Sequence, residues 1–174
     1  MPKQSILRSK TRKEALKHGF RSGEELKVAR LLKEMSIKYE YETLKLSYEV
    51  KPSGKRGAYC NECGSKDILE KKDYITDFYL PDYKLVLEVK GNFSEADQKK
   101  MVAVKEKNMT SNIIMVFQNP NLRVKRGNKI MYSEWCDKKE IEWTSTEKLK
   151  SFLTQRIGLK KKQKYHNLNG KNKL

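Results

Sequence analysis

Two acidic residues and a lysine near the middle of the chain have the types and spacing to act together on a bound group. Asp77 lies three residues before Leu80, and Glu88 and Lys90 follow Leu85 in a second apolar segment. If the two segments form an antiparallel hairpin with Leu80 opposite Leu85, Asp77 stands directly opposite Glu88. Lys90 then lies on the same face as Glu88, because alternate residues of a strand point to the same side. The sequence therefore predicts a cluster of two carboxylates and one ammonium group.

Such a cluster is suited to a hard divalent cation. Directly opposed residues of an antiparallel pair have Cβ atoms about 5 Å apart, so Asp77 and Glu88 would repel each other without a cation between them. Carboxylate oxygens are ligands for Mg²⁺ or Mn²⁺, which polarise a phosphate and lower the pKa of bound water. Lys90 could orient that water or stabilise the charge on the phosphate. The same spacing also fits the solvated face of a surface hairpin, in which Lys90 only neutralises the acids.

The opposite face of this hairpin is apolar. It carries alternate residues of the two segments, namely Phe78, Leu80, Leu85, Leu87 and Val89. A one-residue slip in register would move these side chains to the wrong face and separate the acids. The cluster therefore depends on the loop 81–84 and on burial of the apolar face.

A helix is predicted over about 22–36, before the hairpin. Ser22 followed by Glu25 has the spacing of a capping box. The apolar positions that follow recur with helical periodicity: Val28, Leu31, Leu32 and Met35. Glu24 and Glu25 both lie beside this stripe, so the periodicity does not select one of them as a functional residue.

The remaining pattern indicates an α/β domain. Two segments with strand alternation, 39–41 and 44–50, are separated by a phase slip near Thr43 that indicates a bulge or a bend. The later predicted elements are strands at 74–80 and 85–90, a helix from Ser94 to about 108, a buried strand at 113–117, a hairpin around 127–128, a short helix from Ser133 and a terminal helix containing Leu149, Phe152 and Leu153. Strand, helix and strand in succession favour a parallel crossover.

Positive charge is concentrated at the two ends of the chain. The 174 residues include 39 Lys and Arg against 22 Asp and Glu, a net charge of +17, which indicates a polyanionic partner. We divide the chain into a basic N-terminal arm, 1–19, a central domain, 20–155, and a basic C-terminal tail, 156–174. The two ends together carry +12 of the +17. They could grip phosphates or remain solvated segments.

A turn-rich insertion at 51–72 contains two of the three cysteines. Cys60 and Cys63 have the spacing of one half of a zinc ribbon, which makes them candidate Zn²⁺ ligands, but a second half is missing. Two alternatives are also compatible with this half-motif: a redox role for the thiols, or a turn that binds no metal. The sequence has no apolar run long enough to cross a membrane and no signal-peptide pattern at its N-terminus, so we expect a cytosolic protein without a membrane partner.

Several segments resemble a known family. Thr76-Asp77, ten further residues and then Glu88-Val89-Lys90 resemble the PD-(D/E)xK motif of restriction-endonuclease-like nucleases, with Thr76 in place of the proline. Further segments resemble, in order, those of the phage endonuclease I family of Holliday-junction resolvases, over about residues 20–143: Phe20–Gly23, Tyr39–Glu42, Thr76–Phe78, Glu88–Gly91 and Tyr132–Cys136.

The resemblance implies a restriction-endonuclease-like mixed sheet flanked by helices, in an intertwined homodimer whose active sites are each built from both chains. It implies that Glu25, Asp77 and Glu88 hold Mg²⁺ (or Mn²⁺) and that Lys90 assists catalysis. The family spacing from Arg21 selects Glu25 over Glu24, although a capping glutamate at this position needs no catalytic role.

The predicted function is a magnesium-dependent, structure-selective DNA endonuclease that resolves Holliday junctions and other branched DNA. If the chain is phage-encoded, its location would be the cytosol of the host bacterium. The alternatives are a PD-(D/E)xK nuclease acting on ordinary duplex DNA, in restriction, repair or transposition, and a basic nucleic-acid-binding protein without enzymatic activity.

Overall fold

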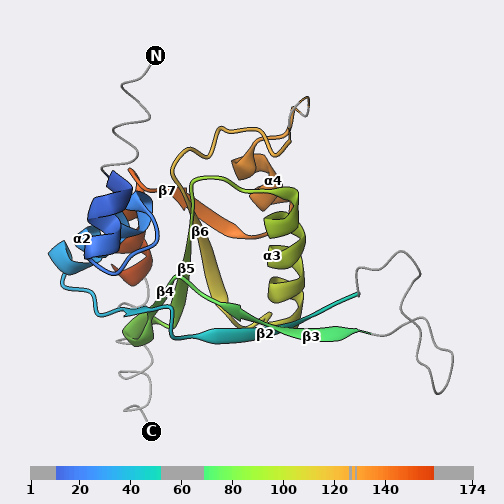
Figure 1. Ribbon diagram of the computed structural model, residues 1–174, viewed down its shortest axis with the longest axis horizontal. Helices are drawn as coiled ribbons and strands as arrows, with labels where there is room; N and C mark the ends of the chain where they lie inside the picture. The colour runs from blue at the N-terminus through green and yellow to red at the C-terminus, as the bar shows by residue number, and fades with distance from the viewer. Residues whose placement is uncertain (1–10, 52–68, 126, 128, 159–174) are drawn as a thin grey trace, which may run out of the picture.

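A mixed sheet with helices on both faces forms the centre of the protein (Figure 1). The computed structural model describes residues 11–51, 69–125, 127 and 129–158. In this part of the chain the main sheet has the strand order β1-β4-β5-β6-β7. These strands are β1 (Glu40–Tyr41), β4 (Phe78–Leu80), β5 (Leu85–Lys90), β6 (Asn112–Phe117) and β7 (Glu142–Ser145). Strands β1, β4 and β5 pair antiparallel, whereas β5, β6 and β7 pair parallel, which confirms the predicted mixed α/β architecture.

Each face of the sheet packs against its own group of helices. On one face lie α2 (Gly23–Glu34) and the helical residues 11–17 and 149–158; on the other lie α3 (Glu95–Lys107) and α4 (Tyr132–Lys138) (Figure 1). Leu85 and Leu87 of β5 belong to the core under α2, whereas Val86 belongs to the core under α3. Because β5 is buried on both faces, it forms a rigid support for the residues at its end.

The two longer helices begin at side-chain caps. Ser22 Oγ accepts a hydrogen bond from the Glu25 N–H at 3.2 Å, and Ser94 forms a reciprocal capping box with Asp97. Both caps satisfy amide groups that the first helical turn leaves unpaired. The predicted helices at 22–36 and 94–108 are confirmed, with ends that differ by one or two residues.

The predicted strand at 74–80 is wrong as a single element. Its first part belongs to β3 (Glu70–Ile75), which pairs with β2 (Lys45–Val50) in a separate two-stranded sheet, and its last part is β4. The chain bends between them at Thr76 and Asp77. The residues 70–72, which the sequence placed in the insertion, are part of β3.

The neighbouring stretch of chain bends at the same place. Glu42, between β1 and β2, has a left-handed backbone with φ 53°, and its N–H donates to the Asp77 carbonyl at 3.1 Å. From Tyr41 to Lys45 the chain advances four residues, whereas their partners, Phe78 and Ile75, are only three residues apart. This extra residue confirms the bulge or bend predicted near Thr43. The Thr76 N–H, which a proline would lack, donates to the Leu44 carbonyl at 3.0 Å.

The hairpin formed by β4 and β5 has the predicted register, with Leu80 opposite Leu85 and Phe78 opposite Leu87. Its loop contains a 3-10 turn, Pro81–Tyr83, followed by Lys84 in the left-handed region with φ 49°. The predicted apolar face of this hairpin is buried in the core under α2.

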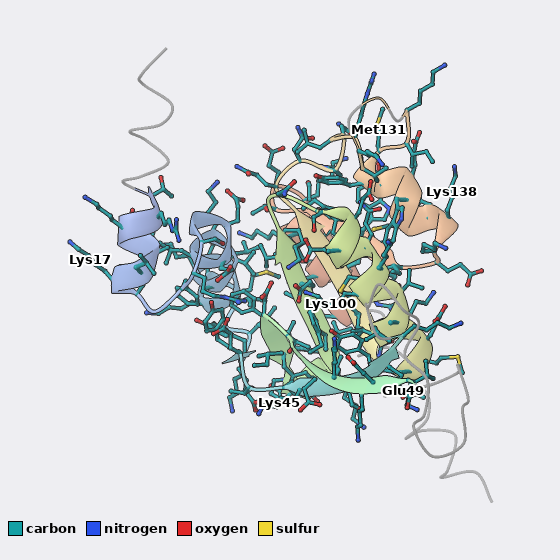
Figure 2. The ribbon with its side chains drawn as sticks, turned by 45° about the vertical axis from the view of Figure 1, so that its right-hand side comes forward. Lys17, Lys45, Glu49, Lys100, Met131 and Lys138 are labelled. Atoms are coloured by element: carbon teal, nitrogen blue, oxygen red, sulfur yellow. The ribbon has the colours of Figure 1, made fainter. Side chains whose placement is uncertain are left out.

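The two-stranded sheet of β2 and β3 lies against α3 (Figure 2). Glu49 of β2, labelled in Figure 2, forms an ion pair with Lys107 of α3 at 2.6 Å. Tyr74 of β3 is buried in the core under α3. The two-stranded sheet is therefore anchored to the domain on the same face of the main sheet as α3.

The C-terminal half follows the prediction in part. The sequence did not predict strand β7, whereas the helix expected from Ser133 begins one residue earlier and the terminal helix is present over 149–158. The hairpin expected around 127–128 is represented by an isolated bridge between Arg123 and Met131; residues 126 and 128 lie outside the described part. In the predicted N-terminal arm, residues 11–17 are helical and Ala15 is fully buried. Among the described residues, no helix is long and apolar enough to span a bilayer.

Candidate active site

Asp77 lies at the bend where the chain passes from β3 to β4. Its side chain is buried, and Oδ2 accepts a hydrogen bond from the Val89 N–H at 2.8 Å. The paired ladder ends at Phe78 and Leu87, so Asp77 is not a ladder partner of Glu88 as the sequence predicted. It is instead held against β5 by its own carboxylate.

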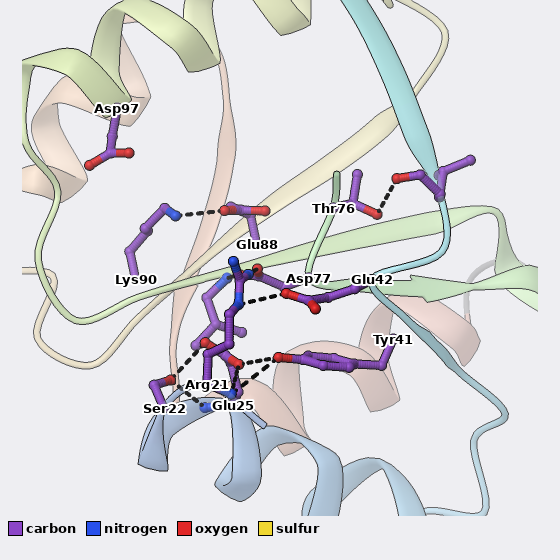
Figure 3. Close-up of polar contacts among 12 residues, drawn as sticks. Arg21, Ser22, Glu25, Tyr41, Glu42, Thr76, Asp77, Glu88, Lys90 and Asp97 are labelled. Atoms are coloured by element: carbon purple, nitrogen blue, oxygen red, sulfur yellow. Dashed lines mark hydrogen bonds and ion pairs between the residues drawn. The ribbon is translucent and has the colours of Figure 1, made fainter. Parts of the chain in front are cut away.

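Glu88 and Lys90 point to one side of β5 and form an ion pair (Figure 3). Lys90 Nζ lies 2.7 Å from Glu88 Oε1, whereas Glu88 Oε2 is buried and has no hydrogen-bond partner among the described residues. Burial has the largest single effect on the pKa of Lys90 and would lower it, but the charge and hydrogen bond of Glu88 and the charges of Asp77 and Asp97 together outweigh burial, so the pKa is raised. The lysine is therefore a cation at neutral pH.

The ionisation of Asp77 is coupled to this pair. Burial, followed by the negative charge of Glu88, raises the pKa of Asp77 from 3.8 to about 7, although Lys90 and the Val89 amide oppose the increase. Asp77 and Glu88 are thus two buried carboxylates that repel each other, and Lys90 offsets this repulsion only in part. Such sites are typical of metal or catalytic centres.

The structure gives Glu24 and Glu25 different surroundings. Glu25 is buried, receives hydrogen bonds from the Tyr41 hydroxyl at 2.5 Å and the Ser22 hydroxyl at 2.8 Å, and its charge acts on Asp77. Burial and the hydrogen bond to Glu25 raise the pKa of Tyr41 to about 12. Glu24 faces away, bonds to Lys27 and lines a groove of about 1210 Å³ beside residues 143–155. Of the two glutamates, only Glu25 is thus directed to the acidic cluster.

Arg21 is a residue of this site to which the sequence assigned no role. Its Nη2 lies 2.8 Å from Asp77 Oδ1 and its Nε lies 2.5 Å from Glu42 Oε1 (Figure 3). Its backbone N–H donates to Glu25 Oε2 at 2.9 Å. The segment Phe20–Gly23 contributes to the family resemblance, but nothing in its spacing placed the guanidinium on Asp77.

Tyr74 is a second residue that the sequence did not indicate. Its hydroxyl is buried without a hydrogen-bond partner in the described chain, and Lys100 Nζ lies 5.6 Å from its ring centroid. Burial and then the charge of Glu88 raise its pKa, so the phenol stays protonated. Tyr74 therefore brings a neutral donor from β3 towards Glu88.

Comparison with known proteins supplies a family for this arrangement. The model of the family described as phage endonuclease I matches residues 66–167. The chain is 31% identical over 122 residues to Endodeoxyribonuclease 1 of Enterobacteria phage T3, which covers 70% of this chain and 68% of that protein. It is 30% identical over 124 residues to Endonuclease I of Escherichia phage T7, which covers 71% of each chain. The chain belongs to the phage endonuclease I family.

Membership of the phage endonuclease I family identifies the protein as an enzyme, an endonuclease. The family match includes Asp77, Glu88 and Lys90 but begins after Glu25. The roles of these four residues remain predictions; Asp77, Glu88 and Lys90 lie together at β5, and the charge of Glu25 acts on Asp77.

The carboxylates fit a hard cation in type, and Glu88 Oε2 offers an unused buried oxygen. In the described conformation, however, no three His, Cys, Asp or Glu side chains in residues 11–51, 69–125 and 129–158 converge as a metal site. Glu25 is held by hydrogen bonds, and Arg21 contacts Asp77 Oδ1. Cys60 and Cys63 lie outside the described residues, and their zinc site stays a prediction. Cys136 is buried and free, and burial raises its pKa to about 12.

Proposed function

We propose that this endonuclease is a magnesium-dependent endodeoxyribonuclease that resolves four-way junctions and other branched DNA in the cytosol of an infected bacterium. The observation that carries the proposal is the cluster formed by the buried Asp77 and Glu88 and the partly buried Lys90, with one unpartnered carboxylate oxygen, at the end of a central strand. The net charge of +17 supports a polyanionic substrate.

Asp77 and Glu88 are the residues that would hold Mg²⁺ or Mn²⁺, with Glu25 as a third acid beside Asp77. When bound, the ion would polarise the scissile phosphate and lower the pKa of a water molecule for phosphodiester hydrolysis. Each of the two buried carboxylates has a reason to accept a cation: the charge of Glu88 opposes ionisation of Asp77, and Glu88 Oε2 makes no hydrogen bond within the described residues.

Lys90 would supply the positive charge that the hydrolysis requires from the protein. It is protonated, largely buried and fixed by Glu88, so its ammonium group is already in place when a phosphate arrives. A preorganised cation stabilises the developing negative charge without further reorganisation. We assign Lys90 to this role rather than to that of a general base, because its pKa is raised.

A homodimer would let the enzyme cut two strands of a junction during one encounter. This assembly, with intertwined chains, is an inference from family resemblance. The measurement that tests it is the molecular mass in solution at micromolar protein concentration, and a monomer would contradict it.

The activity is tested with a synthetic four-way junction and a linear duplex of matched sequence, each incubated with and without Mg²⁺. We expect magnesium-dependent cleavage of the junction and much slower cleavage of the duplex. Equal cleavage of both substrates would favour a duplex nuclease, and tight binding without cleavage would favour a binding protein.

Lys90→Ala and Asp77→Asn should each reduce junction cleavage by at least about 100-fold, the usual effect of losing a preorganised charge in an active site. Junction binding should change by less than about threefold, because most phosphate contacts come from other residues. Lys71→Ala and Asp73→Asn are matched controls, since both residues are exposed on β3. Cleavage by either site variant within a few-fold of wild type would show that the site is elsewhere.

A further inference from the structure

The Arg21 side chain lies between the acidic cluster and solvent. Its side chain is 62% exposed, whereas that of its partner Asp77 is 3% exposed. The guanidinium therefore covers the outer side of a buried carboxylate. Its second partner, Glu42, is 33% exposed and lies in the bend between β1 and β2.

The two oxygens of Asp77 have different partners. Oδ2 accepts from the Val89 N–H, a backbone group fixed by strand β5. Oδ1 faces Arg21 Nη2, which belongs to a long side chain on the turn before α2. Of the two, Oδ1 is the oxygen whose contact can be exchanged without moving the sheet.

A divalent cation and the guanidinium compete for this oxygen. Both are positively charged, and within a few ångströms in a partly buried site they repel each other strongly. Cation binding at Asp77 and Glu88 therefore requires Arg21 to leave Oδ1.

A displaced Arg21 has a suitable new partner in the substrate. A guanidinium binds phosphate through two parallel hydrogen bonds, and Arg prefers such planar anions. The remaining pair with Glu42 is partly exposed, and exposed ion pairs are worth little. A DNA phosphate at the acidic cluster would thus draw Arg21 away from Asp77.

We infer that Arg21 couples DNA binding to metal binding: its guanidinium occupies Asp77 in the free protein and transfers to a DNA phosphate, which frees Asp77 for the cation. This inference rests on the proposed function and adds a residue and an order of events to it. Because coupling between two ligands is reciprocal, DNA should raise the affinity for the cation and the cation should raise the affinity for DNA by the same factor.

The test uses Ca²⁺ as the probe cation, titrated calorimetrically into full-length protein with and without a four-way junction that gels show to remain uncut. For Arg21→Gln without DNA we expect Ca²⁺ to bind at least threefold more tightly than to wild type, because a competing cation is gone. For wild type the junction should tighten Ca²⁺ binding severalfold, and for Arg21→Gln this gain should fall to less than twofold.

Arg30→Gln is the matched control. Arg30 is 59% exposed and forms a 2.6 Å ion pair with Glu14, but it contacts none of the carboxylates of the candidate site. It should retain the wild-type Ca²⁺ affinity and the full gain on DNA binding. An Arg21→Gln variant that matches Arg30→Gln in both measurements would overturn the inference.

Arg21→Lys keeps the test decisive should Arg21→Gln fail to fold. Lysine preserves the charge beside Asp77 but lacks the planar fork, so we expect Ca²⁺ affinity within twofold of wild type and a smaller gain with DNA. An undiminished gain would contradict the inference. Magnesium-dependent cutting of DNA by wild type is measured separately. If wild type cuts no DNA, the proposed function fails. If the variants keep the full gain in Ca²⁺ affinity on adding DNA, only the role of Arg21 is removed.

Discussion

At the scale of single residues, the protein keeps an acid in surroundings that resist its ionisation. Asp77 is buried beside Glu88, and the Val89 amide and Lys90 offset this only in part. The folded domain therefore carries a destabilising charge at its candidate site when no cation is present. Functional sites commonly retain such unfavourable groups because the ligand stabilises them.

The titration of Asp77 should make the stability of the folded protein depend on pH. The pKa of Asp77 is 3.8 in an ordinary environment and about 7 in the folded protein, so between these values the folded state holds a proton that the unfolded state has lost. The free energy of unfolding should consequently decrease as pH rises from about 4 through 7. Asp77→Asn removes this titration.

Thermal unfolding in the presence of a chelator provides the measurement. Between pH 5 and pH 8 we expect wild type to lose at least about 1 kcal/mol relative to Asp77→Asn, since one pKa unit corresponds to about 1.4 kcal/mol. For a domain of this size that is a relative decrease in Tm of about 2–4 °C. Parallel Tm curves for the two proteins would refute the raised pKa.

At the scale of elements, one kinked ribbon and one tight turn position the site. Strands β1 and β2 bend at Glu42, and β3 and β4 bend at Asp77, so that the acid is held where the two sheets meet. The turn at 81–84 then returns the chain so that β5 runs beside β4. Because this turn determines the hairpin register, it also determines the position of Glu88 relative to Asp77.

Lys84 adopts a backbone conformation in this turn that favours glycine. Its φ of 49° and ψ of 47° lie in the left-handed region, which costs a residue with a Cβ roughly 1 kcal/mol. Lys84→Gly should therefore increase the free energy of unfolding by about 0.5–1 kcal/mol without changing cleavage, because the register is preserved. Urea denaturation measures the change, and Lys99→Gly within α3 should show the opposite sign by a similar amount.

At the scale of the whole molecule, an acidic site is set in a strongly basic chain. The net charge of +17 gives long-range attraction to DNA, while the local negative charge around Glu88 and Asp77 suits the proposed cation. Basic side chains such as Lys17, Lys45 and Lys138 project from different parts of the surface (Figure 2). We therefore expect the basic surface to bind the DNA backbone and the acidic cluster to act on a single phosphate.

The C-terminal tail offers a test of this division. Residues 160–174 contain six lysines and no acid. If they bind phosphates, their deletion should flatten the slope of log affinity against log salt by about 0.9 for each phosphate that the tail neutralises, and should weaken junction and duplex binding by similar factors. Cleavage at saturating protein should be nearly unchanged, because the candidate site lies at 25, 77, 88 and 90.

Filter binding across a salt series measures this slope for full-length and shortened proteins. An unaltered slope would mean that the tail remains solvated in the complex. Selective loss of junction binding would instead show that the tail recognises DNA shape.

The sequence by itself determined the elements whose signals are local. The caps at Ser22 and Ser94, the alternation in β5 and the four-residue loop after Leu80 correctly predicted two helices and a hairpin with its register. These features depend on interactions within a few residues, so the pattern of side chains is sufficient. The same pattern brought Glu88 and Lys90 to one face.

Only the tertiary structure decided how these elements meet. The predicted strand at 74–80 divides between two sheets because Thr76 and Asp77 bond to Leu44 and Val89, which are distant in the sequence. The pairing of Arg21 with Asp77, and the choice of Glu25 over Glu24 at the site, likewise depend on how α2 packs beside β5. Periodicity records which face of an element is buried, but the partner of that face is determined by long-range packing.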